Sequence, residues 1–253
     1  MSEREDFMRQ VRVALRHPDG GATGEGRPPA PLAEPLKGVM TPVPPEELVA
    51  KFEKEFAALA GTAHRAATLT ELETILREIL KSVGAKGAVL SRHPLLRQLG
   101  IEEKLPTWDI AVSAWRATKD STADANAEQD FREQAFAAAV GITGVDFVLA
   151  ESGSLVLTSL IGGSQLASLA PPVHIALYRR GQVVESLDEV LAALPVSHDP
   201  SQPSPGRSVV FISGSSRTAD IEQILIRGVH GPGRVHAILV EDSCLEGPGQ
   251  GPQ

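Results

Sequence analysis

The segment FVLAESGSLVLTSLIGGSQLASLAPPVHIALY, residues 147 to 178, decides the fold class. It carries three short apolar runs of strand length, which are Phe147 to Ala150, Leu155 to Leu157 and Val173 to Tyr178. Further apolar runs follow at 209–212 and 235–240, with predicted helices at 186–194 and 218–226. Buried strands that alternate with helices are typical of a largely parallel sheet covered on both faces. We therefore expect a three-layer α/β/α sandwich with a mostly parallel sheet.

The first half of the chain is predicted to be mainly helical. Four-residue spacing of Leu48, Phe52 and Phe56 predicts one helix, and apolar periodicity predicts others at 3–16, 69–82, 94–99 and 128–139. In the last of these, Phe131, Ala135 and Phe136 are expected on one face, and short strands are expected at 87–91 and 109–113.

Residues 17–45 are rich in Gly and Pro, so they form either an extended linker or a loop that wraps the core. We expect an N-terminal helix and linker at 1–45, an α/β domain at 46–243 and a flexible tail at 244–253.

Composition excludes several classes of function. The 253-residue chain has a formal net charge of −8 and no clustered basic stripe, which argues against nucleic acid as a partner. Its charged N-terminus and strand-sized apolar runs predict neither a secretory signal nor a membrane span. A single cysteine, Cys244, cannot hold an iron–sulfur cluster by itself and suits a cytoplasmic location. No Walker loop, HExxH, CxxC or GxSxG motif is present, so we predict no metal site and no serine hydrolase.

The segment GITGVDFVLAESGSLVL, residues 141 to 157, is the first candidate site. Gly144 precedes the apolar run and allows close approach of a ligand to the backbone. Glu151 follows the run beside Gly153, where a carboxylate can act as a nucleophile, a base or a hydrogen-bond acceptor. The alternative is a hairpin turn with solvated polar residues.

His174, in SLAPPVHIAL at 168–177, is the second candidate. Strand alternation points it away from the side of Val173 and Ile175. It is either an acid/base group or a hydrogen-bonded core histidine.

The segment VVFISGSSRTADIEQIL, residues 209 to 225, is the third candidate. A predicted strand, loop and helix would aim free backbone N–H groups at an anion. The loop residues offered as ligands are Ser213, Gly214, Ser215, Ser216, Arg217 and Thr218. Ser216 or Thr218 could instead simply cap the helix. His230, in the following GVHGP turn, either faces the same cleft or interacts with the end of that helix.

These four blocks, GITGVDFVLAESGSLVL, SLAPPVHIAL, ISGSSRTADIE and GVHGP, resemble the signature blocks of the LUD family, and within it of the lactate utilization protein C family. The resemblance is clearest over residues 138–242. It implies a Rossmann-like fold of the NagB/RpiA/CoA-transferase-like group. In related CoA-transferases a glutamate near a glycine is the nucleophile, and Glu151 resembles that residue, although this chain has ESGS where typical members have ETGT.

The resemblance implies a component of a cytoplasmic system that oxidises L-lactate to pyruvate with two iron–sulfur partner proteins. On this reading the chain itself binds no cofactor, the clusters belong to the partners, and a small carboxylate or other anion occupies the cleft. Glu151 and His174 would be the catalytic candidates. Two alternatives remain, which are a stand-alone acyl-CoA or sugar-phosphate transferase or isomerase, and a non-catalytic scaffold or regulatory subunit.

Overall fold

The computed structural model describes residues 42–115, 121–159, 165–194, 208–219, 225–227 and 231–245. At 121–127, 217–219 and 225–227 it describes the backbone alone. The predicted helix at 3–16, residues 17–41 of the predicted linker, His230 and the tail beyond Leu245 lie outside the described residues.

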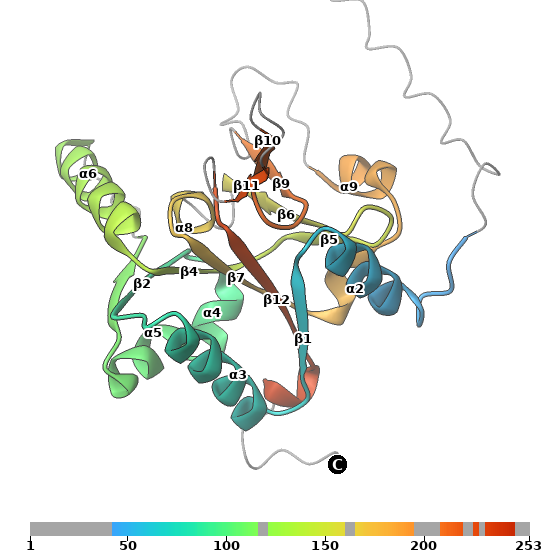
Figure 1. The fold of residues 1–253 in the computed structure, drawn as a ribbon, viewed down its shortest axis with the longest axis horizontal. Helices are drawn as coiled ribbons and strands as arrows, with labels where there is room; N and C mark the ends of the chain where they lie inside the picture. The colour runs from blue at the N-terminus through green and yellow to red at the C-terminus, as the bar shows by residue number, and fades with distance from the viewer. Residues whose placement is uncertain are drawn as a thin grey trace, which may run out of the picture. The chain divides into compact units, whose positions relative to one another are not determined.

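A six-stranded parallel sheet forms the centre of the fold (Figure 1). Its strands, in spatial order, are β1 (Thr62–Ala66), β12 (Arg234–Val240), β7 (Val173–Tyr178), β4 (Val140–Gly144), β2 (Gly87–Leu90) and β3 (Ala111–Ala114). The four central strands are almost entirely buried, as expected for a parallel sheet covered on both faces. The predicted α/β class is confirmed.

One face of this sheet is covered by α3 (Leu69–Ser82), α4 (Pro94–Gln98) and α5 (Ile101–Lys104). Helix α3 begins at a capping residue, because the Thr68 side chain accepts a hydrogen bond from the Glu71 N–H. Its buried side chains recur at helical spacing, with Leu72, Leu76 and Ile79 packed on the sheet. The 3₁₀ turn η1 (Leu105–Trp108) then leads into β3.

The other face is covered by helices and by a second sheet, and the sequence pattern does not distinguish the strands of the two sheets. This sheet has the order β8 (Val183–Val184), β5 (Phe147–Leu149), β6 (Ser154–Thr158) and β9 (Val209–Ile212). Strand β6 pairs antiparallel with both β5 and β9. Helix α2 (Leu48–Ala58) shares an apolar cluster with this sheet and with β7 and β12.

Two more helices, α6 (Ser121–Ala137) and α8 (Leu166–Leu169), lie over the β2, β4 and β7 side of the sheet. Phe131 and Ala135 of α6 are buried as predicted. Phe136 is 63% exposed, so its predicted place on the buried face is wrong. The guanidinium of Arg132 lies over its ring.

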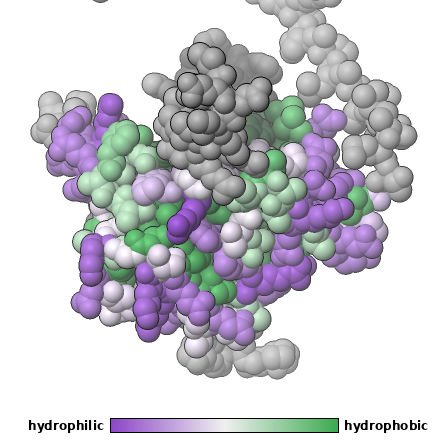
Figure 2. All heavy atoms as spheres, in the orientation of Figure 1, coloured by the Kyte–Doolittle hydropathy of each residue, from purple (hydrophilic) through white to green (hydrophobic). Residues whose placement is uncertain are grey.

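The predicted helix at 218–226 is also wrong for the part that the structure describes. Residues Arg217–Ala219 form β10 and Leu225–Arg227 form β11, paired as an antiparallel ribbon. The remaining short elements are η2 (Arg180–Gln182), α9 (Leu187–Ala193) and η3 (Asp242–Cys244). Apolar residues gather in the middle of the face seen in Figure 2, and hydrophilic residues border them.

Candidate functional site

The order of the strands defines one point where the chain reverses its direction across the sheet. From β2 the chain moves outward to β3, and it then returns to the other side of β2 as β4. The carboxyl ends of β2 and β4 therefore diverge into loops on opposite sides, which leaves a crevice where ligands of open α/β sheets bind. The residues that follow these strands are Ser91 to His93 after β2 and Val145 and Asp146 after β4.

His93 occupies this crevice. Its side chain caps helix α4, because Nδ1 accepts a hydrogen bond from the Leu95 N–H at 3.2 Å. With Nδ1 acting as an acceptor, the proton of the neutral ring lies on Nε2. His93 is 8% exposed, and burial lowers its pKa while the charge of Asp146 opposes that shift. The crevice thus holds a neutral imidazole with a donor on Nε2.

Gly144 makes room for the His93 ring. A Cβ at this position would overlap Nδ1 and Cγ of the imidazole, so any larger residue would displace the histidine. Gly144, which the sequence predicts as a site residue, therefore packs against His93. His93 was not among the predicted site residues. The available signal was the polar run Ser91-Arg92-His93, directly after a predicted buried strand.

A cavity of about 260 Å³ opens beside His93 at the carboxyl ends of β2 and β3. Helices α4 and α5 complete its wall, and its polar and aromatic lining residues are Ser91, Arg92, His93, Arg97, Glu102, Glu103 and Trp115. The lining holds two arginines and two glutamates, so its formal charge is zero. The guanidinium of Arg97 can grip a small carboxylate with two hydrogen bonds.

Glu151 lies elsewhere, in the turn between β5 and β6. Its Oε1 accepts a hydrogen bond of 2.8 Å from the N–H of Leu187, the first residue of α9. Ser186 caps the same helix by accepting from the Glu189 N–H. The carboxylate therefore stabilises the start of α9, which agrees with the hairpin alternative for this segment.

The Ser152–Ser154 segment and the Ser213 loop come together against α2. Ser154 Oγ lies 2.8 Å from Ser152 Oγ and 2.6 Å from Ser213 Oγ, so three hydroxyls form a chain. Gly153 and Gly214 both have positive φ, and a Cβ on either would overlap the backbone of α2 or of Leu59. These glycines thus serve close packing of two loops on a helix.

Beyond Gly214, the same loop runs toward the start of β12. Ser215 is buried, and its hydroxyl has no hydrogen-bond partner among the described residues. The Ser216 N–H donates to the Pro232 carbonyl at 2.9 Å, close to the amino end of β12. Arg217 and Thr218 lie in β10, where the structure describes the backbone alone. In the part of the segment that the structure describes, Arg217–Ala219 and Leu225–Arg227 are strands, so these residues do not form the helix start on which the predicted anion site depended.

His174 is a core residue. It is 0% exposed, and its Nε2 lies 2.8 Å from Thr143 Oγ1 on the neighbouring strand. Burial lowers the pKa of His174 to about 3, and the nearby imidazole of His236 contributes to that shift. A group so hard to protonate is a poor acid/base at neutral pH.

The described parts of the predicted motifs lie at two different ends of the sheet, whereas His230 lies outside the described residues. Gly144 ends β4, at the carboxyl end of the sheet, together with His93. His174 and the Ser216 contact lie at the opposite, amino end of β7 and β12. Within the described ranges no cluster of three or more His, Cys, Asp or Glu side chains could hold a metal ion, and none of the helices is long and apolar enough to cross a membrane.

Comparison with known proteins gives a consistent family. The chain is 29% identical over 242 residues to lactate utilization protein C of Halalkalibacterium halodurans. The aligned region covers 96% of this chain and 99% of the relative. It is 31% identical over 197 residues to lactate utilization protein C of Shouchella clausii, covering 78% and 80%.

Among solved structures, a DUF162 family protein from Deinococcus radiodurans shares the fold. The TM-score is 0.52 at 18% identity, over 79% of this chain and 99% of that one. The LUD domain model matches residues 49–240, which span both sheets and the crevice at His93. The chain therefore belongs to the LUD domain family.

Proposed function

We propose that this protein is a component of a cytoplasmic lactate utilization system, which oxidises L-lactate to pyruvate together with two iron–sulfur partner proteins. The observation that carries the proposal is the similarity to lactate utilization protein C of Halalkalibacterium halodurans along nearly the whole of both chains. Such coverage leaves no domain of that relative unmatched.

Under this proposal the crevice beside His93 takes the small carboxylate. Arg97, which belongs to α4 and lines the cavity, would hold the carboxylate group. The Nε2–H of His93 would donate to the hydroxyl or keto oxygen that distinguishes lactate from pyruvate. Lactate and pyruvate each have only six heavy atoms, so a cavity of about 260 Å³ is large enough for either one.

Oxidation of lactate releases two electrons and two protons. The proposal assigns the electrons to the iron–sulfur clusters of the partners, and it assigns binding and orientation of the carboxylate to this chain. The chain is then required for turnover even though the redox centres belong to other subunits.

The test is anaerobic, lactate-dependent reduction of a dye by the two iron–sulfur partners, with and without this protein. Arg97→Gln in the cavity is compared with Arg132→Gln on α6, which lies outside it. We expect activity to require the chain, Arg97→Gln to raise the KM for lactate by at least about tenfold, and Arg132→Gln to behave as wild type. Full activity without the chain would refute the proposed function. Equal KM values for the two variants would refute the assignment of the cavity.

A further inference from the structure

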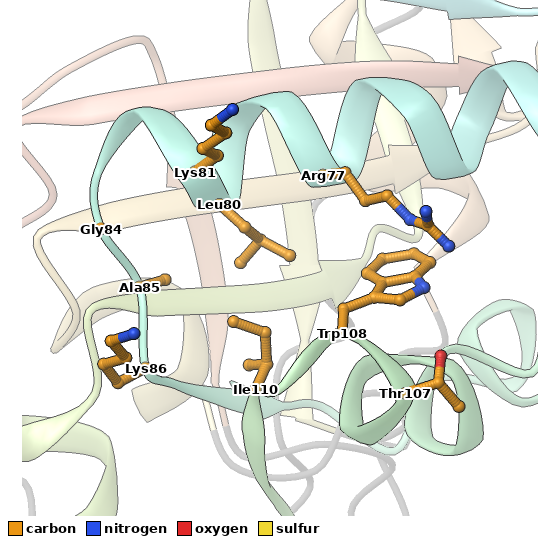
Figure 3. A pocket seen from close by; sticks show the side chains of 9 residues that line it. All are labelled: Arg77, Leu80, Lys81, Gly84, Ala85, Lys86, Thr107, Trp108 and Ile110. Carbon is orange, nitrogen blue, oxygen red and sulfur yellow. The ribbon is translucent and has the colours of Figure 1, made fainter.

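We propose that a second cavity, at the opposite end of the sheet, binds a phosphorylated small molecule that carries more than one negative charge. The cavity has a volume of about 430 Å³ and lies between the last turns of α3, the start of β2 and η1 (Figure 3). Its principal lining residues are Arg77, Leu80, Lys81, Lys86, Trp108 and Ile110. Lys86 and Ile110 directly precede β2 and β3, so the cavity faces their amino ends.

The charge of the lining is the first argument. Arg77, Lys81 and Lys86 give it a formal charge of +3, and no carboxylate lines the cavity. None of the three cations forms an ion pair with any residue that the structure describes. In a chain whose net charge is −8, three unpaired cations around one cavity produce a local positive field that attracts anions.

The position of Arg77 is the second argument. Its guanidinium carbon lies 4.6 Å from the centre of the Trp108 ring (Figure 3). Stacking uses the flat face of the guanidinium and leaves its N–H donors free at the edge, where they can contact a phosphate. The indole thus holds the arginine in place before a ligand arrives, which reduces the entropy lost on binding.

The apolar wall is the third argument. Leu80, Ala85 and Ile110 are buried and form the base of the cavity between the cations. A cavity of this volume is in the range that holds ligands larger than a three-carbon acid. An apolar base with cations at its rim suits a molecule with an organic part and a phosphate, whereas the neutral lining beside His93 suits a single carboxylate.

The two tryptophans of the chain provide the assay. Trp108 lines this cavity and Trp115 lines the one beside His93. In a Trp115→Phe background the fluorescence of the full-length protein reports on Trp108 alone. The probes are AMP and inorganic pyrophosphate, with adenosine as the uncharged control.

We expect AMP and pyrophosphate to change the emission of Trp108 saturably and to compete with each other, while adenosine has no effect. Adding Lys81→Gln and Lys86→Gln together should weaken both probes by roughly tenfold or more, because two charge-assisted contacts are lost. The matched control is Lys54→Gln, an exposed lysine on α2 outside the cavity, which should leave both affinities unchanged.

Three results would each overturn the proposal. They are the absence of a saturable change with either charged probe at millimolar concentration, equal binding of adenosine and AMP, and unchanged affinity in the double lysine variant. Because the readout is fluorescence of the isolated chain, its outcome is independent of whether the chain takes part in lactate oxidation.

Discussion

Replacing His174 with glutamine should reduce the sensitivity of the fold to acid. Burial lowers the pKa of His174 to about 3, whereas a histidine in the unfolded chain titrates near 6.5. Between these values the unfolded chain binds one more proton than the folded chain. Linkage then requires the free energy of unfolding to fall as the pH falls through this window, and the contribution to be intact above it.

The magnitude follows from the shift. Each pKa unit corresponds to about 1.36 kcal/mol. Moving from about pH 7.5 to about pH 5 protonates His174 in the unfolded state alone, which should cost the folded state about 2 kcal/mol. Glutamine does not titrate, and its amide can still form a hydrogen bond with Thr143 Oγ1.

Urea unfolding of both proteins at the two pH values provides the assay. We expect the wild type to lose about 2 kcal/mol more than His174→Gln on acidification. Burial and the charges of His64 and Arg234 also lower the pKa of His236, to about 4, but that residue is common to both proteins and cancels in the comparison. Equal losses in the two proteins would refute the reasoning. If the variant does not fold, an NMR titration of the wild type decides, since a His174 ring that titrates near pH 6.5 contradicts a buried neutral imidazole.

Three further substitutions test the packing around the two sheets. Gly144→Ala should lower the free energy of unfolding by about 1–3 kcal/mol and lower lactate-dependent activity, because the added methyl overlaps the His93 ring. The control is Gly181→Ala, which has nothing within 4 Å of its added Cβ. It should change neither the stability measured by urea unfolding nor the activity measured by dye reduction. Leu76→Ala should cost about 2–5 kcal/mol in urea unfolding, whereas the half-exposed Leu191 of α9 should tolerate alanine at a small fraction of that cost. Ser154→Ala should cost about 1–2 kcal/mol in the same measurement, because it removes the middle hydroxyl of a three-serine chain; a value near zero would mean that water replaces these bonds without penalty.

The sequence predicted the elements whose signal is local. Helix α3 was expected at 69–82 and extends from Leu69 to Ser82, because its apolar stripe, its cap and its charged outer face all lie within one window. The strand β7 was equally clear, since it is apolar and preceded by two prolines. The α/β class followed from such elements.

The 209–227 segment shows where local signal fails. The spacing of Ile221, Ile224 and Leu225 suits a helix, yet Arg217–Ala219 and Leu225–Arg227 pair as strands. Strand β9 pairs with β6, some fifty residues away, and Gly214 packs against the end of α2. These contacts between distant segments determine the path of the chain, and the spacing of apolar residues within 209–227 cannot predict them.

The candidate site was missed for a related reason. His93 and Gly144 become neighbours only because β4 returns to lie beside β2, and strand order is a property of the whole sheet. Sequence alone predicts Gly144 as a site residue and predicts that ligands bind at the carboxyl ends of the strands. Which two strand ends diverge depends on strand order, so Gly144 could not be separated by sequence from His174 and Ser216, which lie at the amino ends of β7 and β12.

The environment of Cys244 agrees with the proposal that the iron–sulfur clusters belong to the partner proteins and not to this chain. Its thiol is buried, lies 3.3 Å from the Ala66 carbonyl as a donor, and has a pKa raised by burial. Metal ligation needs an accessible thiolate, so this cysteine is unsuited to complete a cluster held by a partner. Cys244→Ser should therefore leave lactate-dependent dye reduction unchanged once the loss of packing is allowed for by assaying well below the melting temperature. Loss of activity in a fully folded Cys244→Ser protein would instead show that turnover needs this thiol, and it would contradict a purely binding role for the chain.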